Sequence, residues 1–151
     1  MKRSMPSTPV EYQLLPYYAK VRTREAIDQL KATKKWLKEN EWVQGYSALK
    51  ADDTVTHPFS EGAKKCCLLG AITRHKCCGV ASDAVHEEVR KTGAGSIVMW
   101  NDYPSREKKE VLQLLSRVIH KLQCRLNRDL RLRKQHPDAA KIRDALDMKE
   151  G

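Results

Sequence analysis

The chain has 151 residues, the size of one ordinary domain, which excludes a TIM barrel or a two-domain dinucleotide-binding enzyme. Its 29 lysines and arginines outnumber 19 aspartates and glutamates, and the resulting net charge of +10 favours anionic partners. The sequence contains no apolar run long enough to cross a membrane, and no apolar segment follows its basic N-terminus as in a secretion signal. We therefore expect a cytoplasmic protein that does not bind membranes.

The first part of the chain predicts an irregular lead-in followed by a helix. Residues 1–22 contain Pro6, Pro9 and Pro16, which argues against regular structure there. From Thr23, a candidate cap, the apolar residues recur at helical spacing up to Asn40. Residues 42–45 then predict a turn, and residues 46–58 predict a loop.

A second helix is predicted over about residues 60–74, in the centre of the core. One of its faces carries only small residues, which would let another backbone approach closely. The small residues that we place in the core are Cys67, Gly70 and Ala71. The residues expected to enclose that core are Trp36, Trp42 and Trp100.

The rest of the chain predicts a short helix, an extended run and one long helix. Ser82 is the expected cap of the short helix and Gly93 its end, and residues 96–100 are expected to be extended. The apolar spacing from Val111 predicts a long helix that reaches Gln135, with a short helix or tail over residues 136–151. The predicted fold is mainly α, a compact single-domain helical bundle over residues 23–135 with one long C-terminal helix.

Three short motifs resemble a known group of proteins. They are Trp42-Val43-Gln44-Gly45, Cys67-Leu68-Leu69-Gly70-Ala71, and Trp100-Asn101-Asp102 followed by a helix. Their order and spacing over about residues 24–122 resemble a family of small uncharacterised domains from bacteria and their phages. That family has no established activity, so the resemblance implies an architecture and a set of candidate residues. The extra cysteines at positions 66, 77 and 78 and the basic stretch after Leu122 depart from it.

The cysteines allow two interpretations. Buried, reduced thiols are common in proteins without a disulfide framework, and adjacent cysteines seldom both reach one metal ion. The alternative is a structural zinc module, because soft ligands cluster between positions 66 and 78. Its candidate ligands are Cys66, Cys67, His75, Cys77 and Cys78. We favour the first interpretation and predict no cofactor.

A small cysteine-dependent enzyme is the competing functional class. Cys67 would be the nucleophile, with His86 or His120 as base and Asn101 or Asp102 orienting that base. This chemistry needs an exposed thiol with a lowered pKa, whereas Cys67 lies in a segment expected to be buried. We therefore consider catalysis the less favoured interpretation.

The Trp100-Asn101-Asp102 motif has two interpretations of its own. Asn101 or Asp102 can cap the long helix, because short side-chain acceptors satisfy the free N–H groups of its first turn. Trp100 would then pack on that helix. Alternatively, the polar pair beside an exposed indole binds a ligand.

The second half of the long helix is strongly basic and predicts an anion-binding surface. Its basic residues are Arg117, Lys121, Arg125, Arg128, Arg131, Arg133 and Lys134, against a single acid, Asp129. Such a face either only solubilises the helix or binds phosphates. Lysines 31, 34, 35 and 38 on the first helix could widen the surface. We predict a non-catalytic binding module, in a phage-type or accessory role, for nucleic acid or an acidic protein surface; the sequence leaves its oligomeric state open.

Overall fold

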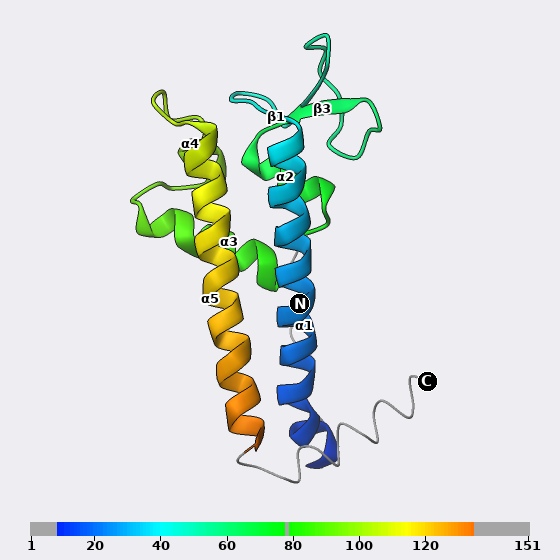
Figure 1. Ribbon diagram of the computed structural model, residues 1–151, viewed down its shortest axis with the longest axis vertical. Coiled ribbons are helices and arrows are strands. Elements are labelled where there is room, and N and C mark those ends of the chain that lie inside the picture. The colour runs from blue at the N-terminus through cyan, green and yellow to red at the C-terminus, as the bar shows by residue number, and fades with distance from the viewer. Residues whose placement is uncertain (1–8, 78, 135–151) are drawn as a thin grey trace.

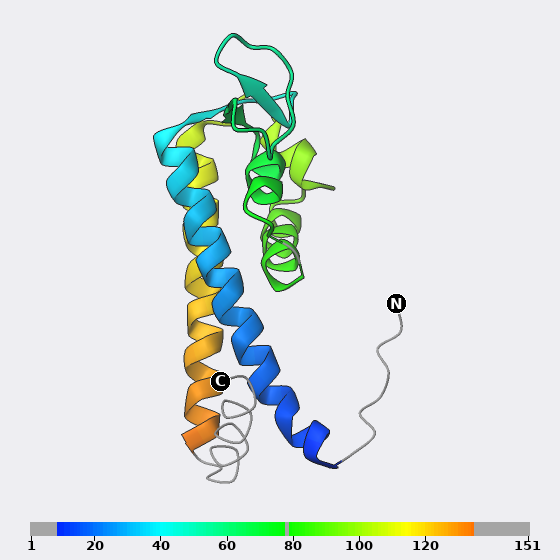
Figure 2. The same cartoon turned by 90° about the vertical axis from the view of Figure 1, so that its right-hand side faces the viewer.

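The computed structural model describes residues 9–77 and 79–134, and the side chains of 21–77 and 79–132 among them. The fold is mainly α, as predicted, and includes a small sheet. Helices α1 (Pro9–Glu39) and α5 (Lys108–Lys134) run side by side in opposite directions (Figure 1). Shorter helices lie along one side of this pair, and the sheet lies at the end where α1 stops (Figure 2). The predicted tail over residues 136–151 lies outside the described residues.

Helix α1 begins earlier than predicted. The backbone is already helical over residues 9–22, where the sequence suggested an irregular lead-in. Proline is well suited to the first helical position, since the N–H it lacks would have no partner there, and Pro9 occupies that position. Thr23 is a buried residue inside the helix rather than its cap. The predicted end of the helix at Asn40 is confirmed within one residue.

The core between α1 and α5 has the predicted helical spacing. Both helices bury one apolar stripe, and each fully buried aliphatic side chain stabilises the fold by about 1.5–3 kcal/mol. The buried aliphatic residues of α1 are Ala26, Ile27, Leu30 and Leu37, and those of α5 are Val111, Leu114, Leu115, Val118, Leu122 and Leu126. These two stripes fix the register of the long helices.

The sheet corrects the predicted helix over residues 60–74 and the predicted loop over residues 46–58. Strand β3 (Ala63–Cys66) lies between β1 (Glu41–Trp42), which is parallel to it, and β2 (Ala48–Lys50), which is antiparallel. Helix α2 (Leu68–Arg74) starts only after β3. The small residues that suggested a helical face are divided between the strand and the helix. Four residues with backbone partners on both sides are too short a segment for an alternating pattern to reveal.

Two further boundaries also differ from the prediction. Helix α3 (Val80–Lys91) begins after Gly79, whose φ of 54° suits glycine, rather than at Ser82. Gly93, with a φ of 92°, follows the end of α3 as expected. Residues predicted to be extended form helix α4 (Ile97–Asn101), because the Ser96 hydroxyl accepts a hydrogen bond from the Met99 N–H at 3.1 Å. Local capping thus outweighs the β propensity of an Ile-Val pair.

The long helix α5 begins after the Trp100-Asn101-Asp102 motif, not at it. The Glu110 carboxylate accepts a hydrogen bond from the Glu107 N–H at 2.7 Å, one half of a capping box. Asn101 and Asp102 therefore do not cap α5; Asn101 ends α4 and Asp102 follows it. None of the described helices combines the length and apolar character needed to span a bilayer.

Candidate functional site

Asn101 is the centre of a buried hydrogen-bond network. Its side chain is 0% exposed. Its Oδ1 accepts from the Trp42 indole N–H at 2.6 Å and from the Leu68 backbone N–H at 2.9 Å. Its Nδ2 donates to the Val43 carbonyl at 3.2 Å. One amide thus joins the loop after β1, the first residue of α2 and the end of α4.

Asp102 and Gln44 extend this network to the surface. Asp102 Oδ1 accepts from Asn101 Nδ2 at 2.9 Å and from the Gly45 N–H at 3.0 Å. Gln44 Nε2 donates to the carbonyls of Asn101 and Tyr103 at 2.9 and 2.8 Å. The first and third sequence motifs are therefore held together by their polar groups. Trp100 is 3% exposed, so the exposed indole that the ligand-binding interpretation required is not present.

The second motif joins the same network through close backbone packing. A Cβ atom on Gly70 would lie 1.9 Å from the carbonyl oxygen of Ser47, so only glycine fits at this place. The same carbonyl accepts from the Cys67 N–H at 3.3 Å, and the Cys67 Sγ accepts from the Gly70 N–H at 3.3 Å. The predicted burial of Cys67, Gly70 and Ala71 is confirmed. Trp36 and Trp42 are half-buried at the edge of the core.

The residues proposed for cysteine catalysis do not form a catalytic arrangement. Burial raises the pKa of the Cys67 thiol, which is the opposite of what an activated nucleophile needs. Within the described chain no hydrogen bond joins Cys67 to a histidine: His86 lies on α3, and His120 lies on α5 with its Nε2 3.6 Å from the Cys124 Sγ. The side chain of Asn101 is already engaged by the backbone and Trp42. These contacts give the motif a structural role.

The described candidate zinc ligands do not converge on one metal position. Burial raises the pKa of Cys66 to about 11. His75 Nδ1 is 2.8 Å from the Ala71 carbonyl, and the Cys77 Sγ is 3.4 Å from the Thr33 hydroxyl. Cys78 lies outside the described residues. Among those that are described, no three His, Cys, Asp or Glu side chains converge as metal ligands.

The basic residues of α5 fall into two groups. Arg117 and Lys121 face α3, where they contact the Glu88 carboxylate at 3.2 and 2.5 Å. Glu88 is almost buried, and the hydrogen bond from Lys121 is the main reason that the pKa of its carboxyl is lowered. Arg128 is 3.9 Å from Asp129. The first two cations therefore hold α3 to α5 and are partly neutralised.

The remaining basic residues of α5 lie farther along the helix, beyond the contacts with Glu88. Arg125 lines a mixed-charge hollow between α3 and α5, together with acidic residues of α3. Arg131 is exposed. The side chains of Arg133 and Lys134 lie outside the described part of the chain. The predicted basic surface is thus divided among neighbours of different charge.

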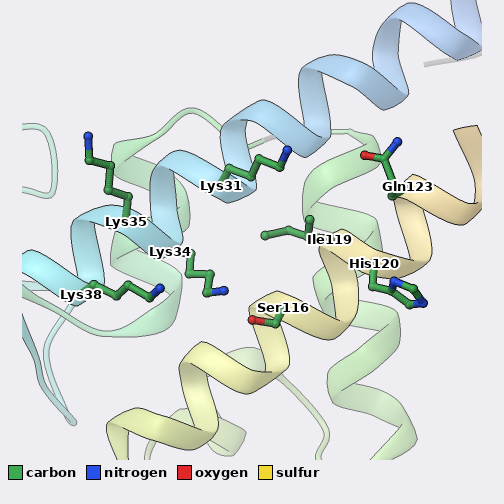
Figure 3. Close-up of a pocket in the computed structure, with 8 residues that line it drawn as sticks. All are labelled: Lys31, Lys34, Lys35, Lys38, Ser116, Ile119, His120 and Gln123. Atoms are coloured by element: carbon green, nitrogen blue, oxygen red, sulfur yellow. The ribbon is translucent and has the colours of Figure 1, made fainter.

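A different basic feature lies between the two long helices, on another side of α5. We call it the lysine groove, a hollow of about 480 Å³ lined by Lys31, Lys34, Lys35, Lys38, Ser116, Ile119, His120 and Gln123. In Figure 3 the Lys34 ammonium points toward α5, Ile119 lies between the helices, and Lys35 points away from α5. The described residues lining the groove include no aspartate or glutamate. The groove concentrates positive charge without an acidic partner in its wall.

The four lysines were visible in the sequence, but their setting was not. Their spacing places them on one side of α1. The sequence suggested that they widen the basic surface of α5. The groove instead pairs them with neutral α5 residues such as Ser116 and Gln123, whereas Arg117 and Lys121 face α3.

Comparison with known families identifies one match. The model of a family described as "Family of unknown function (DUF6197)" matches residues 21–121. The match agrees with the resemblance to an uncharacterised family, while the phage association stays a prediction. It covers all three motifs and the four groove lysines, and it ends before Arg125. Comparisons with curated proteins and with solved structures give no match. The chain belongs to the DUF6197 family.

Proposed function

We propose that this protein is a non-catalytic nucleic-acid-binding module that holds a phosphate backbone in the lysine groove. The observation that carries the proposal is the presence of four lysines beside one hollow whose described lining residues include no carboxylate. Neutralising phosphates with lysine releases counterions, which is the main source of sequence-independent affinity for nucleic acid. The net charge of +10 adds a long-range attraction of the same sign.

The opposite wall of the groove suits a backbone as well. Gln123 is a neutral group whose amide can donate hydrogen bonds to phosphate or sugar oxygens, and His120 can donate from a ring N–H. The Ser116 hydroxyl donates to the Leu112 carbonyl at 3.0 Å and adds a neutral wall. No base-reading motif accompanies the groove. The expected recognition is therefore of the backbone and not of sequence.

The length of the lysine stripe sets the size of the contact. Lys31 and Lys38 are separated by two helical turns, about 10 Å along the axis of α1. Phosphates of one strand of a duplex are about 3.4 Å apart along its axis, so the stripe spans roughly three to four phosphates. Neutralising three to four phosphates predicts that affinity for a duplex falls about 40- to 150-fold between 50 and 200 mM salt, and affinity for a single strand about 20- to 50-fold.

The basic half of α5 is a weaker candidate for this contact. Glu88 partly neutralises Arg117 and Lys121, so binding a phosphate there would compete with an existing ion pair. Arg131 is exposed and can add attraction near the far end of the helix. These residues are expected to assist binding without forming the site.

The experiment compares two variants that lose the same charge. In the groove variant, Lys31, Lys34, Lys35 and Lys38 are replaced by glutamine. In the control variant, glutamine replaces four exposed lysines outside the groove lining, namely Lys50, Lys64, Lys76 and Lys91. Binding of labelled duplex and single-stranded DNA is measured by fluorescence anisotropy at about 50 and 200 mM salt.

The groove variant is expected to lose most of the affinity and most of the salt dependence, whereas the control keeps both apart from a small general charge effect. Equal losses in the two variants would contradict the proposal, because net charge and not the groove would then be responsible. No binding by the natural chain at the lower salt would reject nucleic acid and leave an acidic protein surface as the anionic partner to test.

A further inference from the structure

We infer that the lysine groove takes single-stranded nucleic acid, whose bases stack on Tyr103 and Tyr46 beyond the Lys38 end of the groove. This inference rests on the proposed function and adds the class of ligand. Both tyrosine side chains are more than half exposed, Tyr103 at 58% and Tyr46 at 53%. They lie in the two loops that the Asn101 network joins.

Contacts place these loops at one end of the groove. Lys38 lies in the last turn of α1, and the Lys108 ammonium in the first turn of α5 donates to the Asn40 carbonyl at 2.7 Å. The beginning of α5 is therefore beside the end of α1. The loops after β1 and α4 lie at this same end of the molecule (Figure 1). A strand that follows the lysines toward the end of α1 runs toward the end of the molecule that carries these loops.

The loop that carries Tyr103 is held in place. Gln44 Nε2 donates to the Tyr103 carbonyl at 2.8 Å, which anchors its backbone. The Arg106 guanidinium lies 5.6 Å from the centre of the Tyr103 ring and 4.0 Å from that of Trp100, and its Nε donates to the Trp100 carbonyl at 2.9 Å. The tyrosine is thus an exposed ring on an ordered support, so little conformational entropy is lost when a base stacks on it.

Aromatic rings beside a cationic track favour single strands over duplexes. Lysines hold the backbone while each exposed ring accepts the face of any base, so recognition does not depend on sequence. Bases in a duplex are paired and stacked on one another, so their faces cannot reach Tyr103 or Tyr46. The arrangement therefore predicts tighter binding of a single strand than of a duplex of equal length.

The test separates the contribution of bases from that of phosphates. Two probes are used: a single-stranded oligothymidylate of about 12 nucleotides, and an abasic oligomer of the same length with the same backbone charge. Affinities are measured for the full chain and for Tyr103→Ala, Tyr103→Phe and Tyr46→Ala. The control is Leu132→Ala, which removes an exposed apolar side chain near the end of α5 that is farthest from these loops.

We expect Tyr103→Ala to weaken oligothymidylate binding roughly 5- to 150-fold while leaving the abasic oligomer unchanged. Tyr103→Phe and Leu132→Ala keep the affinity for both probes, and Tyr46→Ala gives a loss of the same kind as Tyr103→Ala. Thermal unfolding of each variant shows whether the fold is intact. Removing the exposed Tyr103 ring leaves its backbone carbonyl for Gln44.

Two results would overturn the inference in distinguishable ways. If both probes bind equally and Tyr103→Ala has no effect, while the groove variant still loses binding, the stacking is wrong and the proposed function stands. If neither probe binds at about 50 mM salt, the proposed function fails and the inference fails with it.

Discussion

Asn101 and the lysine groove contain two opposite kinds of polar chemistry. Asn101 is fully buried, and its oxygen and nitrogen have partners in two distant segments, residues 42–43 and the start of α2. The groove lysines lie beside a hollow that, among the residues the structure describes, has no carboxylate in its lining. Buried polar groups with satisfied hydrogen bonds specify a fold, whereas exposed charges without compensation do little for stability and remain available to a ligand. The difference supports a structural role for Asn101, and it is the basis on which we propose binding in the groove.

The largest effect is expected at the glycine that closes the network. Gly70→Leu places a side chain where even a Cβ atom is 1.9 Å from the Ser47 carbonyl oxygen, and backbone must move to relieve the clash. Overpacking typically costs about 1–3 kcal/mol, and a clash with backbone exceeds that range. We expect the variant not to fold, as measured by circular dichroism and thermal unfolding.

Gly62→Ala is the matched control, since a Cβ there meets no atom closer than 3.6 Å. It should unfold at nearly the temperature of the natural chain. A stable Gly70→Leu variant would mean that α2 does not pack against the Ser47 segment as described.

The next effect concerns the buried amide itself. Asn101→Ala leaves the Trp42 indole N–H, the Leu68 N–H and the Val43 carbonyl without their partner. Each buried group left unsatisfied costs about 1–3 kcal/mol, so a loss of about 3 kcal/mol or more is expected in denaturant unfolding. Asn127→Ala, at an exposed position, should change stability by less than about 0.5 kcal/mol. Similar losses in the two variants would remove Asn101 from the centre of the fold.

Glu88 is intermediate between the buried amide of Asn101 and the exposed groove lysines, because its charge is nearly buried and has two cationic partners. The pKa of its carboxyl is lowered in the folded protein, chiefly by the hydrogen bond from Lys121. Its stabilisation is therefore fully present above the unfolded pKa of about 4.3 and is lost as the pH falls through the lower folded value. Glu88→Gln should lower the free energy of unfolding by about 1–2 kcal/mol at pH 7.

The difference in the free energy of unfolding between Glu88→Gln and the natural chain should shrink below about pH 4. There the Glu88 carboxyl becomes protonated, first in the unfolded chain and then in the folded protein, and the stabilisation from its charge is lost. Urea unfolding at a series of pH values measures this difference. Glu87→Gln, at an exposed neighbour, is the control. A difference that stays constant with pH would mean that Glu88 acts by packing and not by its charge.

The sequence predicted the buried stripes of the two long helices well, but it missed the helical residues 9–22 of α1 and most of the polar network, for physical reasons. Helical spacing in α1 and α5 repeats over many turns, so the stripes that include Leu30 and Leu115 stand out. Strand β3 is only four residues long and is defined by partners on β1 and β2 rather than by its own pattern. Local propensity cannot reveal such a segment.

The role of Asn101 could not be predicted because its partners lie 33 to 59 positions away in the chain. The expected capping of α5 was wrong: Asn101 instead accepts a hydrogen bond from the N–H of Leu68, the first residue of α2, whose N-cap is Cys67. Only one wall of the groove could be predicted. The spacing of the lysines on α1 was evident in the sequence, whereas their position opposite Ser116 and Gln123 depends on how α1 and α5 pack. Candidate residues can be found in a sequence; which of them meet is decided by tertiary contacts.

The smallest expected effect is on the stability of the groove variant, and its sign is informative. Lys31 with Lys35, and Lys34 with Lys38, are like charges four residues apart, and each such pair destabilises a helix by about 0.2–0.5 kcal/mol. Replacing all four with glutamine should therefore raise the free energy of unfolding by about 0.5 kcal/mol at low salt, and by less at high salt where the repulsion is screened. Urea unfolding at the two salt concentrations measures this change. A clear loss of stability would show that the lysines hold the fold together. A small gain accompanied by loss of nucleic-acid binding is the combination expected of charges that repel one another in the free protein and are relieved by a polyanion.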